Sequence, residues 1–167
     1  EMGWLSRKGV QFKWHNNSYQ TFSEFLETLS HNKRKKIKQE RKKIEKNGIT
    51  IERKQGLDIS REDIDFFYQC YCETYRLHNS APYLKQSFFY ELLKNMPNGL
   101  LVVIAKKNDL NIASALSIIG EETLYGRYWG ALEFFSGLHF ELCYYQGQEF
   151  CIENKIKYFE GGAQGEH

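Results

Sequence analysis

Residues that could carry chemistry gather in the last third of the sequence, where glycines and aromatic rings surround single polar side chains. Residues 123–130 read Thr-Leu-Tyr-Gly-Arg-Tyr-Trp-Gly and are expected to form a strand, in which alternate side chains share a face. One face would carry Tyr125, Arg127 and Trp129, and the other Gly126, Tyr128 and Gly130. Glycines inside a strand mark a bulge or a place where a ligand approaches the backbone, whose N–H groups then suit the carbonyl of an acyl group. Arg127 beside rings suits a phosphate or carboxylate; the alternative is a core strand with Arg127 paired to a neighbouring acid.

A nearly apolar helix is expected over residues 136–154, entered from the turn Ser136-Gly137. Its first turn would offer unpaired N–H groups to an anion such as pyrophosphate. At 3.6 residues per turn, His139 and Glu141 point to different sides and cannot form one dyad. The residues that would share a face with His139 are Cys143 and Gln146, and the one that would share a face with Glu141 is Tyr145.

Metal binding is the weaker interpretation of these residues. The four cysteines are Cys70, Cys72, Cys143 and Cys151, and their spacing is not that of a zinc ribbon or a redox pair. A zinc site from His139, Cys143 and His167 is conceivable, but a single histidine on an apolar helix is more often a core residue. We therefore expect buried thiols, no metal and a cytoplasmic location.

A last strand is expected over residues 157–163, and its polar residues reach the end of the sequence. If the strand stays regular, one face carries Tyr158, Glu160, Gly162, Gln164 and Glu166. An amine nucleophile must lose a proton, so Glu160 or Glu166 could act as general base. The alternative is that both are surface carboxylates near a frayed end.

A basic run lies far from these residues, between Lys33 and Lys46. It holds nine Lys or Arg and two Glu. The simplest interpretation is a solvated helix face, with Ile37 and Ile44 docked on the sheet. The sharper one is a surface for RNA, a nucleotide or an acidic membrane, in which phosphate contacts would dominate.

The elements that must position these groups follow from hydrophobic periodicity. Strands are expected at residues 10–14, 49–53, 100–105, 112–119, 123–130 and 157–163. Helices are expected from Phe22 through the basic run to Asn47-Gly48, then over 61–77 behind a Ser60 cap, over 86–96 and over 136–154. The order predicts an α/β (α+β) fold with a mixed sheet, and 167 residues fit one domain. No run is apolar and long enough for a membrane helix.

Several of these motifs together resemble the FemAB-like family of peptidoglycan biosynthesis/recognition proteins, within the GNAT-type acyl-CoA N-acyltransferase superfamily. The resemblance runs from about Gly9 to the end of the sequence. The stretches that carry it are Lys33-Arg-Lys, Glu40-Arg41, Leu124-Tyr-Gly-Arg-Tyr-Trp-Gly130, Leu138-His-Phe-Glu, Cys143-Tyr-Tyr-Gln-Gly147 and Phe159-Glu-Gly-Gly-Ala-Gln-Gly-Glu-His167.

The resemblance implies a GNAT-like, mostly antiparallel sheet and transfer of an acyl or aminoacyl group to an amine. The donor would be acyl-CoA or aminoacyl-tRNA, with tRNA meeting the basic run and a small molecule or peptidoglycan precursor as acceptor. Donor-binding candidates are Tyr125, Gly126, Arg127, Trp129, Gly130, Ser136 and Gly137. Catalytic candidates are Glu141, Glu160, Glu166 and His139. Candidates for substrate contact are Tyr128, Tyr145, Gln164 and His167.

Two departures from the family pattern shape the expectation. The GNAT cofactor loop, Arg/Gln-x-x-Gly-x-Gly/Ala, is matched only in its first half by Arg127-Tyr-Trp-Gly130-Ala-Leu132. The closing strands of a GNAT sheet would lie beyond His167, so residues 1–167 are expected to be one domain of a longer protein, truncated at its C-terminal end. The incomplete loop favours the alternative of a non-catalytic module that recognises a cell-wall precursor or RNA.

Overall fold

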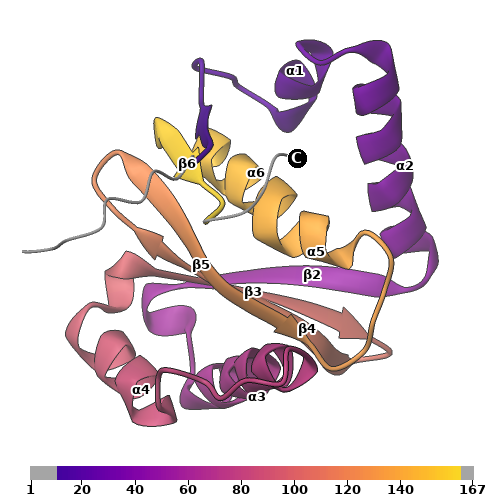
Figure 1. Ribbon diagram of the computed structural model, residues 1–167. Helices are drawn as coiled ribbons and strands as arrows, with labels where there is room; N and C mark the ends of the chain where they lie inside the picture. Colours follow the sequence, from indigo (N-terminus) through magenta and orange to yellow (C-terminus); the bar gives the residue numbers. More distant parts are fainter. Residues whose placement is uncertain (1–10, 163–167) are drawn as a thin grey trace, which may run out of the picture.

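An open six-stranded sheet forms the middle layer of the fold in a computed structural model, which describes residues 11–162 (Figure 1). In chain order the strands are β1 (Lys13–His15), β2 (Ile49–Gln55), β3 (Leu100–Lys107), β4 (Leu110–Ile119), β5 (Thr123–Ala131) and β6 (Tyr158–Glu160). Their order across the sheet is β1-β6-β5-β4-β3-β2. The β5–β6 pair is parallel and the other neighbours are antiparallel, which confirms the predicted mixed, mostly antiparallel sheet.

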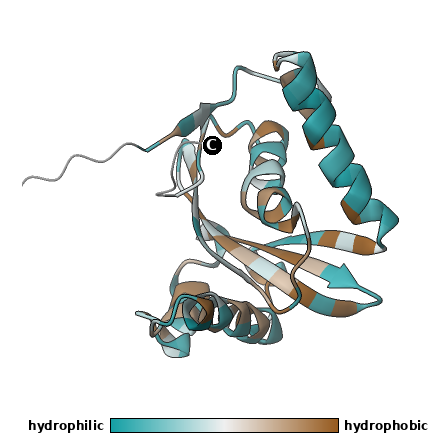
Figure 2. Cartoon of the chain, turned by 45° about the vertical axis from the view of Figure 1, so that its right-hand side comes forward, coloured by the Kyte–Doolittle hydropathy of each residue, from teal (hydrophilic) through white to brown (hydrophobic). Residues whose placement is uncertain are grey.

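Helices cover both faces of this sheet (Figure 1). On one face lie α3 (Arg61–Leu77) and α4 (Gln86–Asn95). On the other lies one continuous helix built of α5 (Leu138–Phe140), a π-helical turn (Glu141–Tyr145) and α6 (Gln146–Glu153). Beyond it stand α1 (Phe22–Glu27) and α2 (His31–Lys46), and α2 is mostly hydrophilic along its length (Figure 2). Two short 3-10 segments, Gly56–Asp58 and Pro97–Gly99, complete the chain.

The central strand β3 is buried on both faces, as its continuous apolar run predicted. Leu100, Val102 and Ile104 pack in one core cluster with residues of α3 and α4. The alternate side chains, including Leu101 and Val103, pack in a second cluster with residues of α5 and α6. The sheet therefore divides the interior into two cores.

Helix α3 begins and ends at the predicted residues because both ends are capped. The Asp63 N–H donates to Ser60 Oγ (3.1 Å), and the Ser60 N–H donates to Asp63 Oδ2 (2.8 Å), which is a capping box. At the other end Asn79 has a φ of 52°, and the Asn79 and Ser80 N–H groups donate to the carbonyls of Arg76 and Tyr75. That pattern is a Schellman motif, which fixes the backbone at the end of the helix.

The predicted single helix from Phe22 through the basic run is wrong, because the chain breaks between α1 and α2. The Thr28 hydroxyl donates to the Phe25 carbonyl (2.7 Å) at the end of α1, and Ser30 is extended ahead of α2. Side chains of Thr and Ser compete with helical hydrogen bonds in this way. The break lets α1 pack its rings against Tyr145 while α2 runs in another direction.

Two further expectations need correction. The last strand is shorter than predicted: β6 ends at Glu160, and Gly162 has a φ of 94°, so Tyr158, Glu160 and Gly162 do not form one regular strand face. The helix after Gly137 contains the π turn, which adds a residue to one turn and shifts every later side chain around the helix. Gln146 therefore lies with Glu141 and not with His139, and its Nε2 donates to Glu141 Oε1 (2.7 Å).

Candidate functional site

Strand β5 is paired along its full length on one side only. On the β4 side the register shifts between Leu116, opposite Tyr128, and Ser117, opposite Gly126, so Arg127 is the extra residue of a β-bulge. On the β6 side only Thr123 to Tyr125 are paired, in parallel, with β6. From Gly126 to Ala131 no described residue pairs with β5 on this side, although the backbone of Glu160 and Gly161 lies beside Gly126, 3.3 and 3.5 Å from the position of a Cβ there.

The bulge changes which side chains share a face. Leu124 and Trp129 pack on the same core cluster beneath α5. Residues with this difference in number would point to opposite faces in a regular strand. Tyr128 points to the other side of the sheet, with its ring 5.2 Å from Tyr71 and 5.9 Å from Phe89. The predicted common face of Tyr125, Arg127 and Trp129 is therefore wrong, because the extra residue reverses the alternation after Arg127.

Arg127 stands exposed at the bulge. Its guanidinium lies 4.9 Å from the centre of the Tyr125 ring, and Nη1 donates to the Gly126 carbonyl (3.2 Å). Among residues 11–162 no carboxylate forms an ion pair with Arg127. The alternative of Arg127 paired to a neighbouring acid is thus not seen there, and the guanidinium keeps donors for an anion.

Three hollows adjoin this edge and share Trp129. The apex hollow, about 30 Å³, is lined by residues that include Ser117, Gly126, Arg127, Cys143 and Gly161. The tyrosine hollow, about 400 Å³, is lined by residues that include Tyr71, Thr74, Tyr75, His78, Arg127 and Tyr128. The apolar hollow, about 370 Å³, is lined by residues that include Thr74, His78, Phe134, Phe135, Ser136, Gly137 and His139. Of the donor-binding candidates, Gly126, Arg127, Trp129, Ser136 and Gly137 therefore line these hollows, whereas Tyr125 and Gly130 do not.

The side chains that line the three hollows are apolar or uncharged polar groups, apart from Arg127 and the imidazoles of His78 and His139. The hydrogen bond with the Tyr71 hydroxyl and partial burial raise the pKa of Tyr75 to about 12, so Tyr75 keeps its proton at neutral pH. Burial raises the pKa of the Cys143 thiol far above neutrality, which makes it a poor nucleophile. The imidazole of His139 packs 4.5 Å from the Trp129 ring.

Helix α3 packs directly against Gly130 and fills the space that a side chain would need at this position. A Cβ at this position would lie 1.8 Å from the Cys70 carbonyl oxygen and 2.8 Å from Thr74 Oγ1. The Thr74 hydroxyl also donates to the Trp129 carbonyl (2.8 Å). The glycine that matches the first half of the cofactor motif thus allows close helix packing, and α3 is clamped against the uncovered edge of β5.

The start of α5 borders the apolar hollow. Gly137 has a φ of 89°, which favours glycine, and the Leu138 N–H donates to the Phe135 carbonyl (3.1 Å). A Cβ on Gly137 would lie 3.6 Å from the Glu40 Cβ atom of α2. The expected anion site at this helix start therefore has an acidic residue as its neighbour.

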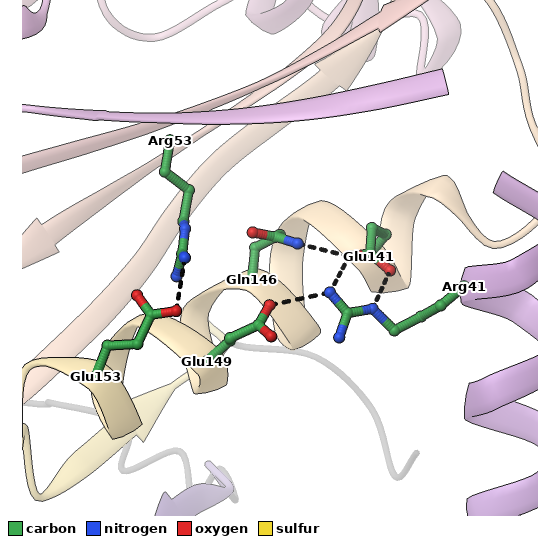
Figure 3. Close-up of polar contacts among 6 residues, drawn as sticks. All are labelled: Arg41, Arg53, Glu141, Gln146, Glu149 and Glu153. Atoms are coloured by element: carbon green, nitrogen blue, oxygen red, sulfur yellow. Dashed lines mark hydrogen bonds and ion pairs between the residues drawn. The ribbon is translucent and has the colours of Figure 1, made fainter. Parts of the chain in front are cut away.

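Glu141 lies in a buried polar network between α2 and the π turn (Figure 3). Arg41 Nε and Nη2 donate to Glu141 Oε2 (3.1 Å) and Oε1 (3.0 Å), and Nη2 also contacts Glu149 Oε2 (2.9 Å). The Glu141 side chain is 3% exposed. Burial disfavours the charge of Arg41, but hydrogen bonds and charges from Glu149 and Glu141 outweigh it and raise the pKa of Arg41. The network lines a cleft of about 750 Å³ between α1, α2, β2 and α6, away from the β5 edge.

The other polar candidates either form hydrogen bonds or ion pairs, or lie outside the described residues. Glu160 pairs with Lys13 (3.2 Å) and accepts a hydrogen bond from Gln11 (3.1 Å) at the sheet edge. The Tyr145 hydroxyl donates to Glu40 Oε2 (2.8 Å) on the α2 side. Gln164, Glu166 and His167 lie outside the described residues. Glu141 and Tyr145 therefore contact α2 and not β5, whereas Glu160 is paired with Tyr125 of β5 through its backbone and directs its carboxylate to Lys13 of β1.

Sequence reasoning missed the polar contribution of α3 to this site. Thr74, Tyr75 and His78 line the hollows, and Tyr71 was predicted only as a core residue. The signal was present, because residues 71, 74, 75 and 78 recur at helical spacing on one face. Arg41 was named only within the Glu40-Arg41 stretch of the resemblance, and its pairing with Glu141 was missed.

The basic helix α2 carries a cationic outer surface. Residues that include His31, Arg34, Lys35, Lys38 and Lys42 border a shallow depression of about 370 Å³. In the described part of the chain, the α2 cations with an ion-pair partner are Lys36 and Arg41. Ile44 packs in the core beneath the sheet face, whereas Ile37 packs against the α1 cluster and not on the sheet.

Residues 11–162 contain no group of three or more His, Cys, Asp or Glu side chains arranged to hold a metal ion. The third zinc ligand considered, His167, lies outside this range. Over the same residues, no helix combines the length and apolar content that crossing a lipid bilayer requires.

Comparisons with known proteins agree with this architecture. The sequence model of the FemAB-like family, described as peptidoglycan biosynthesis/recognition, matches residues 1–167. Among curated proteins no sequence matches the chain. The structure of FemX is similar with a TM-score of 0.69 and 14% identity, over 96% of this chain and 55% of FemX.

Two further solved structures share the fold. L-PGS from Bacillus licheniformis matches with a TM-score of 0.58 and 15% identity, over 81% of this chain and 42% of that one. A C-terminal domain assigned to a lysylphosphatidylglycerol synthetase from Agrobacterium fabrum gives 0.57 and 14%, over 79% and 41%. At these identities the likeness shows the fold, and the chain spans about half the length of the structures it matches.

Proposed function

Because this chain belongs to the FemAB-like family of peptidoglycan biosynthesis/recognition proteins, we propose that it is a GNAT-like transferase domain that moves an acyl or aminoacyl group to an amine. The observation that carries the proposal is the bulged strand β5, which within residues 11–162 is paired with β6 at its start and has no strand partner on that side from Gly126 onward. An uncovered strand edge offers main-chain groups to an extended donor, and the hollows beside it offer room for the reacting ends. Arg127 supplies the cation for an anionic donor.

An aminoacyl-tRNA donor is favoured by α2 and by the relatives. The outer surface of α2 presents lysines without carboxylate partners in the described chain, which suits a phosphate backbone. The name lysylphosphatidylglycerol synthetase describes a protein that attaches a lysyl group, and that protein shares the fold. Acyl-CoA is the competing donor, and a peptidoglycan precursor with a free amine is the proposed acceptor.

The test is a transfer assay on the purified chain with alanyl-tRNA, lysyl-tRNA or acetyl-CoA as donor, and a lysine-containing stem peptide as acceptor. We expect the acceptor to gain the mass of one aminoacyl group with a charged tRNA. Transfer from acetyl-CoA alone would overturn the tRNA version. No transfer from any donor, with a correctly folded chain, would overturn the enzyme.

The dependence of tRNA binding on salt concentration tests the role of the α2 surface separately from that of the β5 edge. We expect tRNA binding to weaken steeply as salt rises, and Lys35→Gln with Lys38→Gln to reduce the slope by about 2, because each lysine releases about one counterion. Lys94→Gln, on α4 on the opposite side of the sheet, is the matched control and should leave the slope unchanged. Binding that is independent of salt would contradict the role of α2.

A second candidate is a non-catalytic module that recognises a cell-wall precursor or RNA. The observation that favours it is Gly130, the glycine of the half-matched cofactor motif, because α3 fills the space that a donor would need there. Calorimetry distinguishes the two candidates. Precursor binding without any binding of acyl-CoA or charged tRNA would favour the recognition module.

A further inference from the structure

The proposed transfer requires a group that accepts the proton of the attacking amine. The carboxylates of the described chain that the sequence suggested for this step are held in ion pairs elsewhere, Glu141 with Arg41 and Glu160 with Lys13. A base must lie within hydrogen-bonding reach of the nucleophile. A base for the proposed transfer is therefore expected among the residues that line the β5 edge.

The tyrosine hollow and the apolar hollow meet at three residues, Thr74, His78 and Trp129. The apolar hollow suits the acyl part of a donor, and the tyrosine hollow, with its hydroxyls and Arg127, suits a polar acceptor. The reacting atoms would meet where the two hollows join. Of the three shared residues, His78 alone carries a side chain that can act as a general base.

The backbone of His78 is fixed relative to β5 by two independent devices. His78 is the C-cap of α3, and the Schellman hydrogen bonds from Asn79 and Ser80 hold the chain there (3.1 and 3.0 Å). One turn earlier, the Thr74 hydroxyl is bonded to the Trp129 carbonyl. His78 is exposed, so these devices fix the position of its backbone beside β5 and leave its imidazole accessible to a bound substrate.

We propose that His78 accepts the amine proton in the transfer reaction; this assignment rests on the proposed function. The amine nitrogen forms a bond to the acyl carbon, and its proton passes to the neutral imidazole of His78. The bond from the acyl carbon to the ester oxygen, or to the thioester sulfur, then breaks. His78 returns the proton to that leaving atom and regains its neutral form, so no other reactant is consumed.

Other titratable groups around His78 are less suited to this role. Those that line the two hollows with it are Tyr71, Tyr75, Arg127, Tyr128 and His139. Tyr75 retains its proton because its pKa is raised to about 12. His139 lines the apolar hollow only, with its ring against Trp129.

The test compares His78→Gln with His15→Gln, which removes an exposed imidazole from the distant strand β1. With alanyl-tRNA and the stem peptide, we expect His78→Gln to lower kcat by about 100-fold with little change in the donor KM. The wild-type and His15→Gln profiles of kcat/KM against pH should fall on the acid side, where the base is protonated, and the His78→Gln profile should lose that step. Added imidazole should restore part of the rate of His78→Gln.

Two results would overturn the assignment, and they differ in what else they overturn. An active wild type beside a His78→Gln variant with the same rate and pH profile removes His78 and leaves the proposed function standing. A folded wild type that transfers nothing removes the proposed function and His78 with it. Matched thermal unfolding of the two variants establishes that a lost rate does not reflect a lost fold.

Discussion

The two polar regions of the molecule use charge in opposite ways. Between α2 and α6, Arg41 is bonded to two carboxylates and Glu141 is almost fully buried. At the β5 edge, Arg127 is exposed and has no carboxylate partner in the described chain, and it lines the tyrosine hollow with tyrosines and the imidazole of His78. The last third of the sequence contains a candidate site residue in each region, Glu141 in the first and Arg127 in the second.

The difference teaches that a carboxylate near a candidate site is not by itself a candidate base. A buried acid that is bonded to a guanidinium and an amide has its proton-accepting oxygens occupied, so it holds elements together. An unpaired cation and neutral groups beside an uncovered strand leave capacity for a ligand. Substitutions should therefore affect stability in the first region and binding in the second.

The largest expected effect is on the network. Arg41→Leu leaves Glu141 charged and buried without its guanidinium, and we expect the free energy of unfolding to fall by about 3 kcal/mol in urea denaturation. Arg76→Leu is the control, because Arg76 is 69% exposed in its pair with Glu73 and its loss should cost far less stability than the loss of Arg41. Equal costs for the two variants would contradict the structural role of the network.

Gly130→Ala should have the next largest effect, because its Cβ would lie 1.8 Å from the Cys70 carbonyl oxygen. We expect α3 to move from β5 at a cost of about 2 kcal/mol, measured by the same denaturation. Gly126→Ala, where the nearest atom is 3.3 Å away, should cost much less. If Gly130→Ala left the free energy of unfolding unchanged, helix packing would not require this glycine, and Gly130 would again be a candidate for donor binding.

Asp63 extends the comparison to the start of α3, where a paired carboxylate caps a helix. Burial disfavours its charge, but hydrogen bonds from Lys54 and Ser60 outweigh it and lower the pKa of Asp63 below 3.8. The unfolded chain therefore binds this proton first on acidification. The stabilisation is complete above about pH 4 and is lost as pH falls through the folded-state pKa.

Asp63→Asn should remove about 1 kcal/mol at neutral pH and flatten the loss of stability in acid, followed as the melting temperature between pH 7 and pH 2. Asp58→Asn, in the preceding turn, is the control. A variant that kept the full acid dependence would assign that dependence to other carboxylates.

The smallest effect on stability belongs to Arg127→Gln, which should change the free energy of unfolding by less than about 0.5 kcal/mol. Its effect on function should be larger, about a tenfold weaker affinity for the anionic donor in a thermal-shift titration. A large loss of stability without a change in donor affinity would place Arg127 with the network and not with the site.

Local signals predicted most of the elements. The Ser60 cap, the turn after Leu77 and the alternation of β3 to β5 depend on neighbouring residues, and the structure confirms those boundaries closely. The break between α1 and α2 lies at Thr28 and Ser30, local signals that the hydrophobic stripe across them concealed. The π turn and the early end of β6 leave no mark on hydrophobic periodicity. A periodicity of 3.6 cannot reveal an inserted residue in a helix, so it assigned Gln146 to the wrong face.

The site was predicted in part for the same reason. The glycines of β5 indicated a bulge, and the structure has one at Arg127. The pairing of Glu141 with Arg41 joins residues 100 positions apart, and the clamp of Thr74 on Trp129 joins residues 55 apart. Neither contact leaves a trace in one sequence, so the role of α3 could be recognised only after the fold was known.

Strand β1 has a consequence for the order in which the molecule assembles. Its three residues pair only with β6, and the contact of Gln11 with Glu160 closes a loop across 149 positions. Closing so long a loop is slow and is rewarded by few hydrogen bonds. During synthesis β1 leaves the ribosome long before β6 has been made. We therefore expect the sheet to form first in the β3–β4–β5 meander, and the β1–β6 pair to form last. The same edge should be the first to exchange its amide hydrogens in the finished protein.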